Sequence, residues 1–384
     1  MKGVYLDNGA TSFPKAPGVV ESMSEFLISV GCNVNRGGYD SSFEAENVVF
    51  ETRELICELF NFPKPENVIF TKNITESLNV LIKGLLKPGD HVVVSSMEHN
   101  AVMRPLNSLK AYGVEYSRVQ CNTYGELNID DVISNIKSNT IGIIMTHASN
   151  VCGTILDLKR IGSICKEKGL YFIVDTAQTA GFLDIDYKEL NADAIAFTGH
   201  KGLLGPQGIG GFIISDDLAS KVAPLIEGGT GSLSDEEIQP YYMPDKFEGG
   251  TLNIPGIYGL NASLKYILKE KVSTIREKEL YLLEHFLEGL LNIPEINIIG
   301  KKNIEYRTAV VSIDVPNKDN AEVSYELNSR FGIMTRCGLH CAPSAHRTLG
   351  TFPKGTIRFS FSHFNAIDEV KYTIDAIYKV LKVL

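Results

Sequence analysis

The chain lacks several features that mark particular classes of protein. Its 384 residues contain no tryptophan, no internal repeat and no low-complexity tract. No apolar run is long enough to span a bilayer. The stretch from Met1 to Asp7 has no apolar signal-peptide core. We therefore expect a cytoplasmic protein without a membrane partner.

An excess of positive charge is also missing. The chain has 37 Lys and Arg residues against 46 Asp and Glu residues, a formal net charge of -9. This balance argues against nucleic acid as a main partner. The seven cysteines are an odd number and are scattered along the chain, which fits reduced thiols better than a disulfide framework.

Nucleotide-binding signatures are absent too. No Walker-type phosphate loop and no complete G-x-G-x-x-G is present. The glycine-rich run Gly208–Gly211 fails the second pattern because Ile213 stands where the last glycine belongs. Hypotheses that rest on a nucleotide therefore lose support.

Short β-rich runs alternate with helical stretches between about residues 65 and 215. Strands that alternate with helices predict a mainly parallel, doubly wound sheet. The predicted strands are Asn67–Thr71, His91–Ser96, Val114–Val119, Ile141–His147, Leu170–Val174, Asp193–Thr198 and Gly210–Ile214. The predicted helices between them are Glu76–Leu86, Ala101–Lys110, Ile129–Ser138 and Leu158–Lys168.

The rest of the chain predicts a second, smaller domain. A loop rich in glycine and proline, about residues 224 to 256, precedes a long helical stretch, Gly256–Leu291. Mixed signals follow, with strands at Thr308–Ile313 and Thr356–Phe361 and helices at Ala321–Phe331 and Ala366–Val383. A chain of this length usually exceeds one compact core. We predict a large α/β domain, residues 15–255, and a small α+β domain, residues 1–14 and 256–384.

An aspartate and a lysine each follow one of the predicted apolar strands. Asp175 comes directly after Tyr171–Val174, and Lys201 comes three residues after Ala194–Thr198. Open α/β sheets bind ligands at the carboxyl ends of their strands. Pyridoxal 5′-phosphate (PLP) needs an amine to form a Schiff base and a carboxylate to keep its ring nitrogen protonated. A surface lysine and an ordinary strand-end aspartate would look the same, so the flanking residues decide.

Other polar residues fall on the same predicted edge. Thr75 opens a helix whose free N–H groups could bind a dianion, although plain helix capping explains this segment alone. His99 could lie flat on a ring and carry protons, or simply cap the start of its helix. The amides of Asn150 and Gln178 could bond a phenolic oxygen or a carboxylate. Each of these residues alone is weak evidence.

The run Arg336–Cys341 places thiols beside a cation. A thiol in such surroundings is a candidate thiolate nucleophile. Zinc is the alternative, with Cys337, His340, Cys341 and His346 as ligands. Structural zinc sites usually carry a second cysteine pair, which is missing here. We therefore rank a nucleophile above a metal site and expect no metal, with an inert buried thiol as the plain alternative for Cys337.

Arg358 lies inside an apolar predicted strand, between Ile357 and Phe359. A charge in such a place needs a partner. A carboxylate ligand held by both arms of the guanidinium would supply one. Arg358 is therefore a candidate for binding a substrate carboxylate.

With these residues in hand, the chain resembles fold-type I PLP enzymes of the class V aminotransferase group. Within that group it is similar to the cysteine desulfurases and selenocysteine lyases, over nearly the whole chain. The run Arg336–Cys341 resembles the second group of desulfurases, whose sulfur-accepting cysteine closes that motif. The other matching segments are Tyr5–Thr11, Ser95–His99, Ser149–Val151 with Gly153–Thr154, Val174–Gln178 and Gly199–Lys201.

The resemblance implies roles for the residues around the cofactor. Lys201 would form the Schiff base, Asp175 would hold the pyridinium nitrogen, and His99 would stack on the ring. Asn150 and Gln178 would also contact the cofactor, Gln178 at its phenolic oxygen. The phosphate would be held by Thr75, Thr198, His200 and, from the neighbouring subunit, Thr251. The last of these implies a homodimer.

The resemblance also implies the substrate side of the site. Asn150, Arg336 and Arg358 would hold the substrate carboxylate. Cys341 would accept sulfur, and His99 and His340 would carry protons. The expected reaction converts L-cysteine to L-alanine and leaves a persulfide on Cys341. A sulfur-acceptor protein or a small thiol would then take the sulfur.

Three alternatives stay open at this point. The enzyme could act on L-selenocysteine as a selenocysteine lyase. It could instead be another PLP-dependent aminotransferase or β-lyase that does not use Cys341. Outside enzymes, it could be a thiol or zinc-binding protein that uses Cys337, His340, Cys341 and His346. Alanine with a protein persulfide as products would indicate a desulfurase, and a keto acid would indicate an aminotransferase or another β-lyase. Bound zinc without PLP would favour the third alternative.

Overall fold

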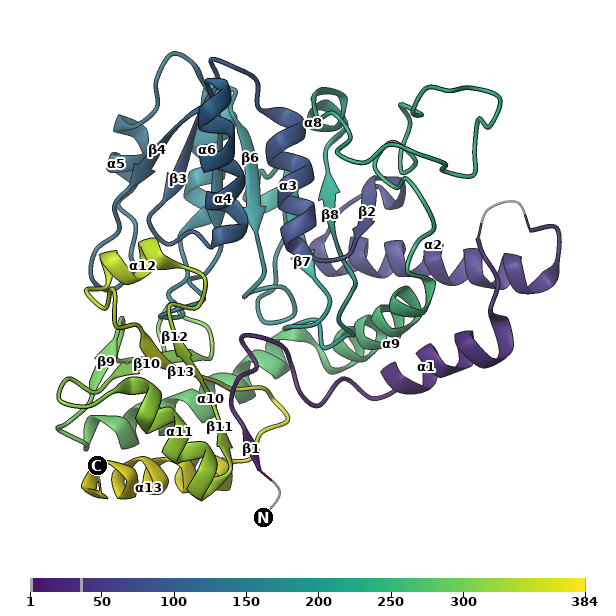
Figure 1. Cartoon of the computed structure of the whole chain (residues 1–384). Coiled ribbons are helices and arrows are strands. Elements are labelled where there is room, and N and C mark those ends of the chain that lie inside the picture. Colours follow the sequence, from purple (N-terminus) through teal and green to yellow (C-terminus); the bar gives the residue numbers. More distant parts are fainter. Residues whose placement is uncertain (1–2, 35–36, 384) are drawn as a thin grey trace.

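The computed structural model describes residues 3–34 and 37–383. A large sheet with helices on both faces forms one part of the molecule, and a smaller α+β part lies below it (Figure 1). No helix within the described residues is long and apolar enough to cross a membrane.

The large sheet has seven strands in the order β2-β8-β7-β6-β5-β3-β4. The neighbours from β7 to β4 pair in parallel, whereas β8 is antiparallel to both β2 and β7. Parallel neighbours align their carboxyl ends along one edge, which is where ligands bind in such sheets. The strands are β2 (Val68–Thr71), β3 (His91–Ser95), β4 (Glu115–Val119), β5 (Thr140–Thr146), β6 (Tyr171–Asp175), β7 (Ala194–Thr198) and β8 (Gly210–Ile214).

Alternating side chains bury both faces of this sheet. In β5, Ile143 and Met145 pack into one core and Ile144 into the other, as the two-residue period of a strand requires. The first core is covered by α2 (Asp40–Phe60), α5 (Ile129–Ser134), α6 (Leu158–Lys168) and α9 (Ile254–Glu270). The second is covered by α3 (Ile74–Leu85), α4 (Asn100–Leu109) and α8 (Asp216–Lys221).

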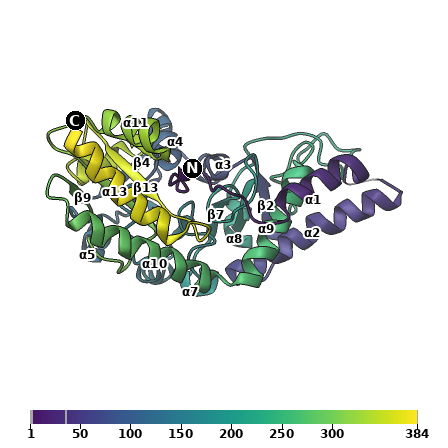
Figure 2. The same ribbon diagram turned by 90° about the horizontal axis from the view of Figure 1, so that it is seen from below.

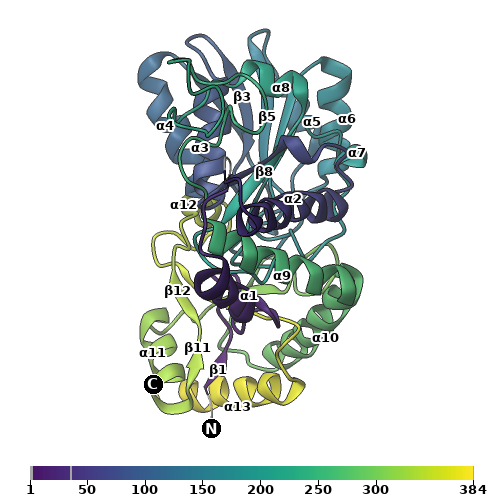
Figure 3. The ribbon, with the colours of Figure 1, turned by 90° about the vertical axis from the view of Figure 1, so that its right-hand side faces the viewer.

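Further helices pack around α9, which covers the first core. The helices α1 (Val19–Glu25) and α2 both pack against α9, and Figure 3 shows α2 and α9 side by side below the large sheet. The short helix α7 (Tyr187–Leu190) lies beside α6.

The small part is built on a four-stranded antiparallel sheet in the order β12-β13-β10-β9. A two-stranded parallel pair, β1 with β11, ties the N-terminal segment to it. Figure 2 shows α10 and α13 running alongside each other under this part. The strands are β1 (Val4–Tyr5), β9 (Asn297–Ile299), β10 (Val310–Asp314), β11 (Ile333–Met334), β12 (Arg336–Gly338) and β13 (Thr356–Ser360). The helices are α10 (Val272–Leu291), α11 (Asn320–Phe331), α12 (Pro343–Thr348) and α13 (Ile367–Val383).

The predicted fold class is confirmed, and the predicted strands of the large sheet lie within about one residue of the observed ones. The helices α1 and α2 were not predicted from the sequence. The division after residue 255 stays a prediction. Buried residues of α9, such as Ile257 and Leu264, belong to the core of the large sheet, whereas Leu282 and Phe286 of α10 belong to the core of the small part.

Candidate active site

A cavity of about 300 Å³ opens at the carboxyl edge of the large sheet. Its walls come from the start of α3, the start of α4, and the segments that follow β5, β6 and β7. The topology therefore brings together segments that are far apart in the sequence. Seven of the residues predicted from the sequence line it, namely Thr75, His99, Asn150, Asp175, Gln178, His200 and Lys201.

Asp175 is the last residue of β6 and is almost fully buried, with 2% of its surface exposed. Its Oδ1 accepts a hydrogen bond of 2.9 Å from the backbone N–H of Ala177. Burial raises the pKa of this carboxyl above its ordinary value, and the Ala177 N–H and Lys201 act in the opposite direction. A nearby cation, such as a protonated ring nitrogen, would favour the ionised form of Asp175.

Lys201 lies in a tight turn directly after β7. The turn is closed by hydrogen bonds of 2.8 Å from Leu204 N to Lys201 O and from Gly205 N to Gly199 O. Burial of the ammonium, followed by the charge of Arg358, lowers the pKa of Lys201 to about 8. Near physiological pH a much larger share of this amine is therefore neutral than in an ordinary lysine, and the neutral form is the one that acts as a nucleophile or base.

The turn also depends on a close approach between two backbones. Gly202 lies so near Ala180 that a Cβ on Gly202 would come within 2.4 Å of the Ala180 carbonyl oxygen. A side chain at this position would push the lysine-bearing turn away from the segment that follows Asp175.

His99 is the N-cap residue of α4. Its Nδ1 accepts a hydrogen bond of 3.0 Å from Ala101 N, so the proton of the neutral ring lies on Nε2. Burial, followed by the charge of Lys201, lowers the pKa of His99 to about 4. The ring is therefore neutral at physiological pH. His99 both caps α4 and lines the cavity, so the two roles considered for it from the sequence are compatible.

The predicted phosphate end of the site contains unsatisfied polar atoms. Thr75 is exposed at the start of α3, where Asn73 caps the helix by accepting a hydrogen bond of 3.0 Å from Glu76 N. Within the described residues, Thr198 Oγ1 and His200 Nδ1 are buried and have no hydrogen-bond partner. Thr198 is not among the residues that line the cavity. Buried polar atoms without partners fit a site that takes an additional polar group.

Two arginines and one aspartate meet beside the cavity. Arg358, with 2% of its surface exposed, donates from Nη2 to Asp7 Oδ1 at 3.0 Å and from Nη1 to Asn150 O at 3.0 Å. Arg336 is exposed and donates from Nε to Asp7 Oδ2 at 3.0 Å. Asp7 is therefore a charge partner of Arg358 within the protein, whereas the sequence indicated only a substrate carboxylate. Asp7 lies in the segment Tyr5–Thr11, and the resemblance of that segment to the family was the signal in the sequence that could have identified it.

Asn150 makes hydrogen bonds with two neighbours. Its backbone oxygen accepts from Arg358, and its side-chain Nδ2 donates to the backbone oxygen of His340 at 2.7 Å. Gln178 donates from Nε2 to Gly9 O at 3.1 Å. Both amides line the cavity and are held by backbone groups.

Cys341 lines a second cavity of about 300 Å³, which shares Thr75 and His99 with the first. All seven cysteines lie within the described residues, and Cys341 alone is exposed. Its backbone has a positive φ of 57°, and that of His340 before it is 46°. Two successive residues in this left-handed region make a sharp turn that presents the thiol next to the lysine-bearing cavity.

The His340 side chain lies outside the lining of both cavities. It is buried, and its Nε2 lies 3.0 Å from Thr356 Oγ1. Burial, followed by the charge of Arg358, lowers the pKa of His340 to about 2. The structure does not bring His340 to the reacting groups, and its role as a proton carrier stays a prediction.

The four residues of the zinc alternative do not form a metal cluster. Among residues 3–34 and 37–383, no group of three or more His, Cys, Asp or Glu side chains is placed to hold a metal ion. The rings of His340 and His346 have centroids 5.5 Å apart. Cys337 is partly buried against the core of the small part, and burial raises the pKa of its thiol.

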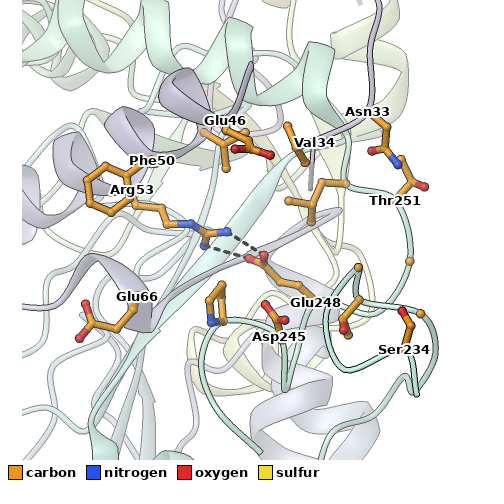
Figure 4. A pocket seen from close by; sticks show the side chains of 17 residues that line it. Asn33, Val34, Glu46, Phe50, Arg53, Glu66, Ser234, Asp245, Glu248 and Thr251 are labelled. Carbon is orange, nitrogen blue, oxygen red and sulfur yellow. Dashed lines mark hydrogen bonds and ion pairs between the residues drawn. The ribbon is translucent and has the colours of Figure 1, made fainter. Parts of the chain in front are cut away.

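Thr251 lies away from the cavity that holds Lys201. It lines a separate cavity of about 700 Å³, shown in Figure 4. Within that cavity Arg53 and Glu248 form a buried ion pair with contacts of 3.0 and 2.7 Å, and Glu248 Oε1 also accepts from Phe70 N at 2.7 Å. In its own subunit Thr251 therefore does not line the cavity that holds Lys201.

Comparisons with known proteins agree with the geometry. The family model for aminotransferase class V matches residues 4–373. A protein named probable cysteine desulfurase from Pyrococcus abyssi is 35% identical, covering 99% of this chain and 95% of that protein. A second of that name, from Methanothermobacter thermautotrophicus, is 33% identical, covering 96% and 92%.

A solved structure is similar over the whole chain. It is the apo structure of a cysteine desulfurase from Thermococcus onnurineus, which is 33% identical, with a TM-score of 0.93 and coverage of 100% of this chain and 95% of that one. The match extends through both parts of the fold and through the segments that carry Asp175, Lys201 and Cys341. The chain belongs to the aminotransferase class V family and has the fold of its cysteine desulfurases.

Proposed function

We propose that this protein is a PLP-dependent cysteine desulfurase, which converts L-cysteine to L-alanine and keeps the sulfur as a persulfide on Cys341. One observation carries this proposal. The cavity that holds Lys201 and Asp175 adjoins the cavity that holds the exposed Cys341, and His99 lines both. The relatives named cysteine desulfurase support the same activity.

The residues of the first cavity fit PLP. Asp175 offers a buried carboxylate to a ring nitrogen, and Lys201 offers an amine of lowered pKa. The unpartnered atoms of Thr198 and His200 would bond the phosphate, together with Thr75 at the start of α3. When bound there, PLP supplies an electron sink for the negative charge that forms when the amino acid loses its Cα proton.

The chain's own groups would prepare the amino acid for this step. Arg358 would hold the substrate carboxylate with donors that Asp7 and Asn150 leave free. The Lys201 amine, neutral in part because its pKa is about 8, would accept the Cα proton. His99, which carries its proton on Nε2, would lie against the ring of PLP without adding positive charge.

Cys341 would perform the sulfur transfer. Its thiolate attacks the sulfur of L-cysteine, and an S–S bond forms as the bond from Cβ to sulfur breaks. The electron pair of the broken bond stays with the three-carbon fragment, which takes up protons and leaves as L-alanine. The products are one L-alanine and one persulfide for each L-cysteine, so atoms and electrons balance.

A homodimer with shared active sites is part of this proposal. Thr251 lies outside its own subunit's site, so a neighbouring subunit is the place where it could meet a phosphate. A two-fold interface is the commonest arrangement among soluble oligomers. Sedimentation at working concentration should give a dimer, and an active monomer would contradict the shared site.

A direct product assay tests the proposed function. Purified protein supplied with PLP is incubated with L-cysteine or L-selenocysteine, and alanine and protein persulfide are quantified together. We expect equal amounts of alanine and persulfide in the first turnover with L-cysteine. Alanine formed from L-selenocysteine alone would favour a selenocysteine lyase, and a keto acid instead of alanine would favour an aminotransferase or another β-lyase.

A further inference from the structure

Two arginines face each other directly on neighbouring strands. In the antiparallel pair β12–β13, Arg336 is the register partner of Arg358. Like charges opposite each other across a sheet destabilise it. Asp7, from the segment that follows β1, lies between them and accepts from both, at 3.0 Å in each case. One carboxylate from the other end of the chain thus offsets this repulsion.

Backbone contacts fix the position of Asp7. Its own backbone oxygen accepts a hydrogen bond of 3.0 Å from Ala10 N, and its backbone forms a bridge with Ser360 of β13. The side chain is 14% exposed, so water competes only weakly for its bonds. Asp7 therefore fixes one arm of the Arg358 guanidinium, while Asn150 O fixes the other.

Asp7 holds Arg358 without using all its donors. A guanidinium has five N–H groups, and the contacts with Asp7 and Asn150 use one on each terminal nitrogen. The Nε of Arg358 is buried and has no partner within the described residues. Donors thus remain for an incoming carboxylate, in an orientation that Asp7 sets.

The same contacts lead to the nucleophile. Arg358 donates to the backbone oxygen of Asn150, whose Nδ2 donates to His340 O at 2.7 Å. The next residue is Cys341, whose backbone oxygen accepts from Asn100 N at 2.8 Å. Three hydrogen bonds thus join the Asp7 carboxylate to the peptide that precedes the thiol.

We propose that Asp7 is a positioning residue that orients Arg358 for the substrate carboxylate and so selects substrates that carry one. This inference rests on the proposed function, because it assigns Asp7 a part in recognising L-cysteine. Asp7 acts through Arg358 and does not itself touch the reacting atoms. Loss of its charge should therefore weaken the preference for a carboxylate more than the chemistry at sulfur.

The test compares two substrates in the intact holoenzyme. L-cysteine carries a carboxylate, and L-cysteinamide carries a neutral amide in its place. For Asp7→Asn we expect the ratio of kcat/KM for L-cysteine to that for L-cysteinamide to fall about tenfold or more, chiefly through a higher KM for L-cysteine. Asp375→Asn, which makes the same change in an exposed ion pair with Lys379 on α13, should leave the ratio unchanged.

The outcomes separate positioning from a purely structural role. Equal losses for both substrates, or an unchanged ratio, would overturn the proposal. If Asp7→Asn does not give folded protein, Asp7→Glu decides, because its carboxylate is displaced by one methylene. A severalfold lower ratio in that variant supports the proposal, and a ratio equal to that of the wild type contradicts it. Wild-type turnover of L-cysteine tests the proposed function separately from this ratio.

Discussion

The two sides of the candidate site are built in opposite ways. On the side of the large sheet, Asp175 and Lys201 lie at strand ends, and enclosure shifts the pKa of both groups. On the side of the small part, Cys341 is exposed on a sharp turn, and the nearby Arg336 is half exposed. We call these the lysine side and the thiol side.

The difference matches the chemistry expected of each side. Moving protons at a carbon atom needs groups whose protonation is tuned, and burial provides that tuning. Delivering sulfur to another molecule needs a thiol that the other molecule can reach. The buried thiols show the cost of enclosure, because burial raises the pKa of Cys57 to about 11 and that of Cys121 to about 12.

The largest effect should come from the lysine side. Lys201→Ala removes both the amine that would hold PLP and the base for the Cα proton, so turnover of L-cysteine should fall about 10³-fold or more. Borohydride reduction of the wild-type protein with PLP, followed by peptide mapping, should label Lys201. Lys265→Ala, at an exposed ion pair with Glu51, is the control. A label on another lysine would show that the site is misplaced.

The next effect contrasts the two ends of the large sheet. Asp175→Asn keeps the shape but removes the charge at the carboxyl end of β6, and we expect turnover to fall about 10- to 10²-fold while PLP is retained. Asp193→Asn, just before β7, changes a carboxylate that accepts from Phe172 N at the opposite end. That variant should change stability but not turnover of the folded protein. Similar losses of turnover in Asp175→Asn and Asp193→Asn would contradict the assignment of catalysis to the carboxyl end of the sheet.

The lysine side could be predicted from sequence for a simple reason. Asp175 and Lys201 follow apolar strands, and parallel strands carry their carboxyl ends to a common edge. Their meeting follows from the local pattern and the topology rule alone. The strand ends themselves were predicted within about one residue, because buried strands are short apolar runs with clear boundaries.

The contacts between distant segments could not be predicted in this way. Asp7 and Arg358 are 351 residues apart, and nothing in either local pattern indicates their ion pair. The Nδ2 of Asn150 bonds the backbone of His340, which depends on how the small part sits against the large sheet. The helix α2 was missed although Val49, Arg53, Ile56 and Phe60 recur at helical spacing on its buried face.

On the thiol side, exposure should set the order of chemical reactivity. Iodoacetamide under native conditions should modify Cys341 at least about tenfold faster than Cys57 or Cys121, because only thiolates react and burial disfavours them. Mass spectrometry of peptides taken at successive times gives the order. Faster modification of a buried cysteine than of Cys341 would contradict the contrast between exposed and buried thiols.

The smallest effect concerns the buried support of the thiol side. His346 on α12 is fully buried, and burial lowers its pKa to about 4, whereas an unfolded histidine titrates near 6.5. As pH falls below 6.5 the unfolded chain binds the proton first, so this histidine loses its stabilising contribution. His346→Asn can keep the contact with Thr351 Oγ1 and does not titrate.

The free energies of unfolding of the wild type and His346→Asn should therefore converge in acid. We expect the advantage of the wild type to shrink by about 1 kcal/mol between pH 7.5 and pH 5.5, measured by urea unfolding. His285→Asn, at a position on α10 that is only partly buried, serves as the control and should show a smaller change. A difference for His346→Asn that does not vary with pH would contradict the account of this histidine.

The most direct test of the two-sided site compares Cys341→Ser with Cys337→Ser. Persulfide and alanine are quantified after L-cysteine is added, and PLP content is measured in the same samples. Cys341→Ser should retain PLP, because Lys201 and Asp175 are untouched, yet form no persulfide and almost no alanine. Cys337→Ser should behave nearly as the wild type. Full turnover in Cys341→Ser, or loss of turnover only in Cys337→Ser, would contradict the assignment of sulfur transfer to Cys341.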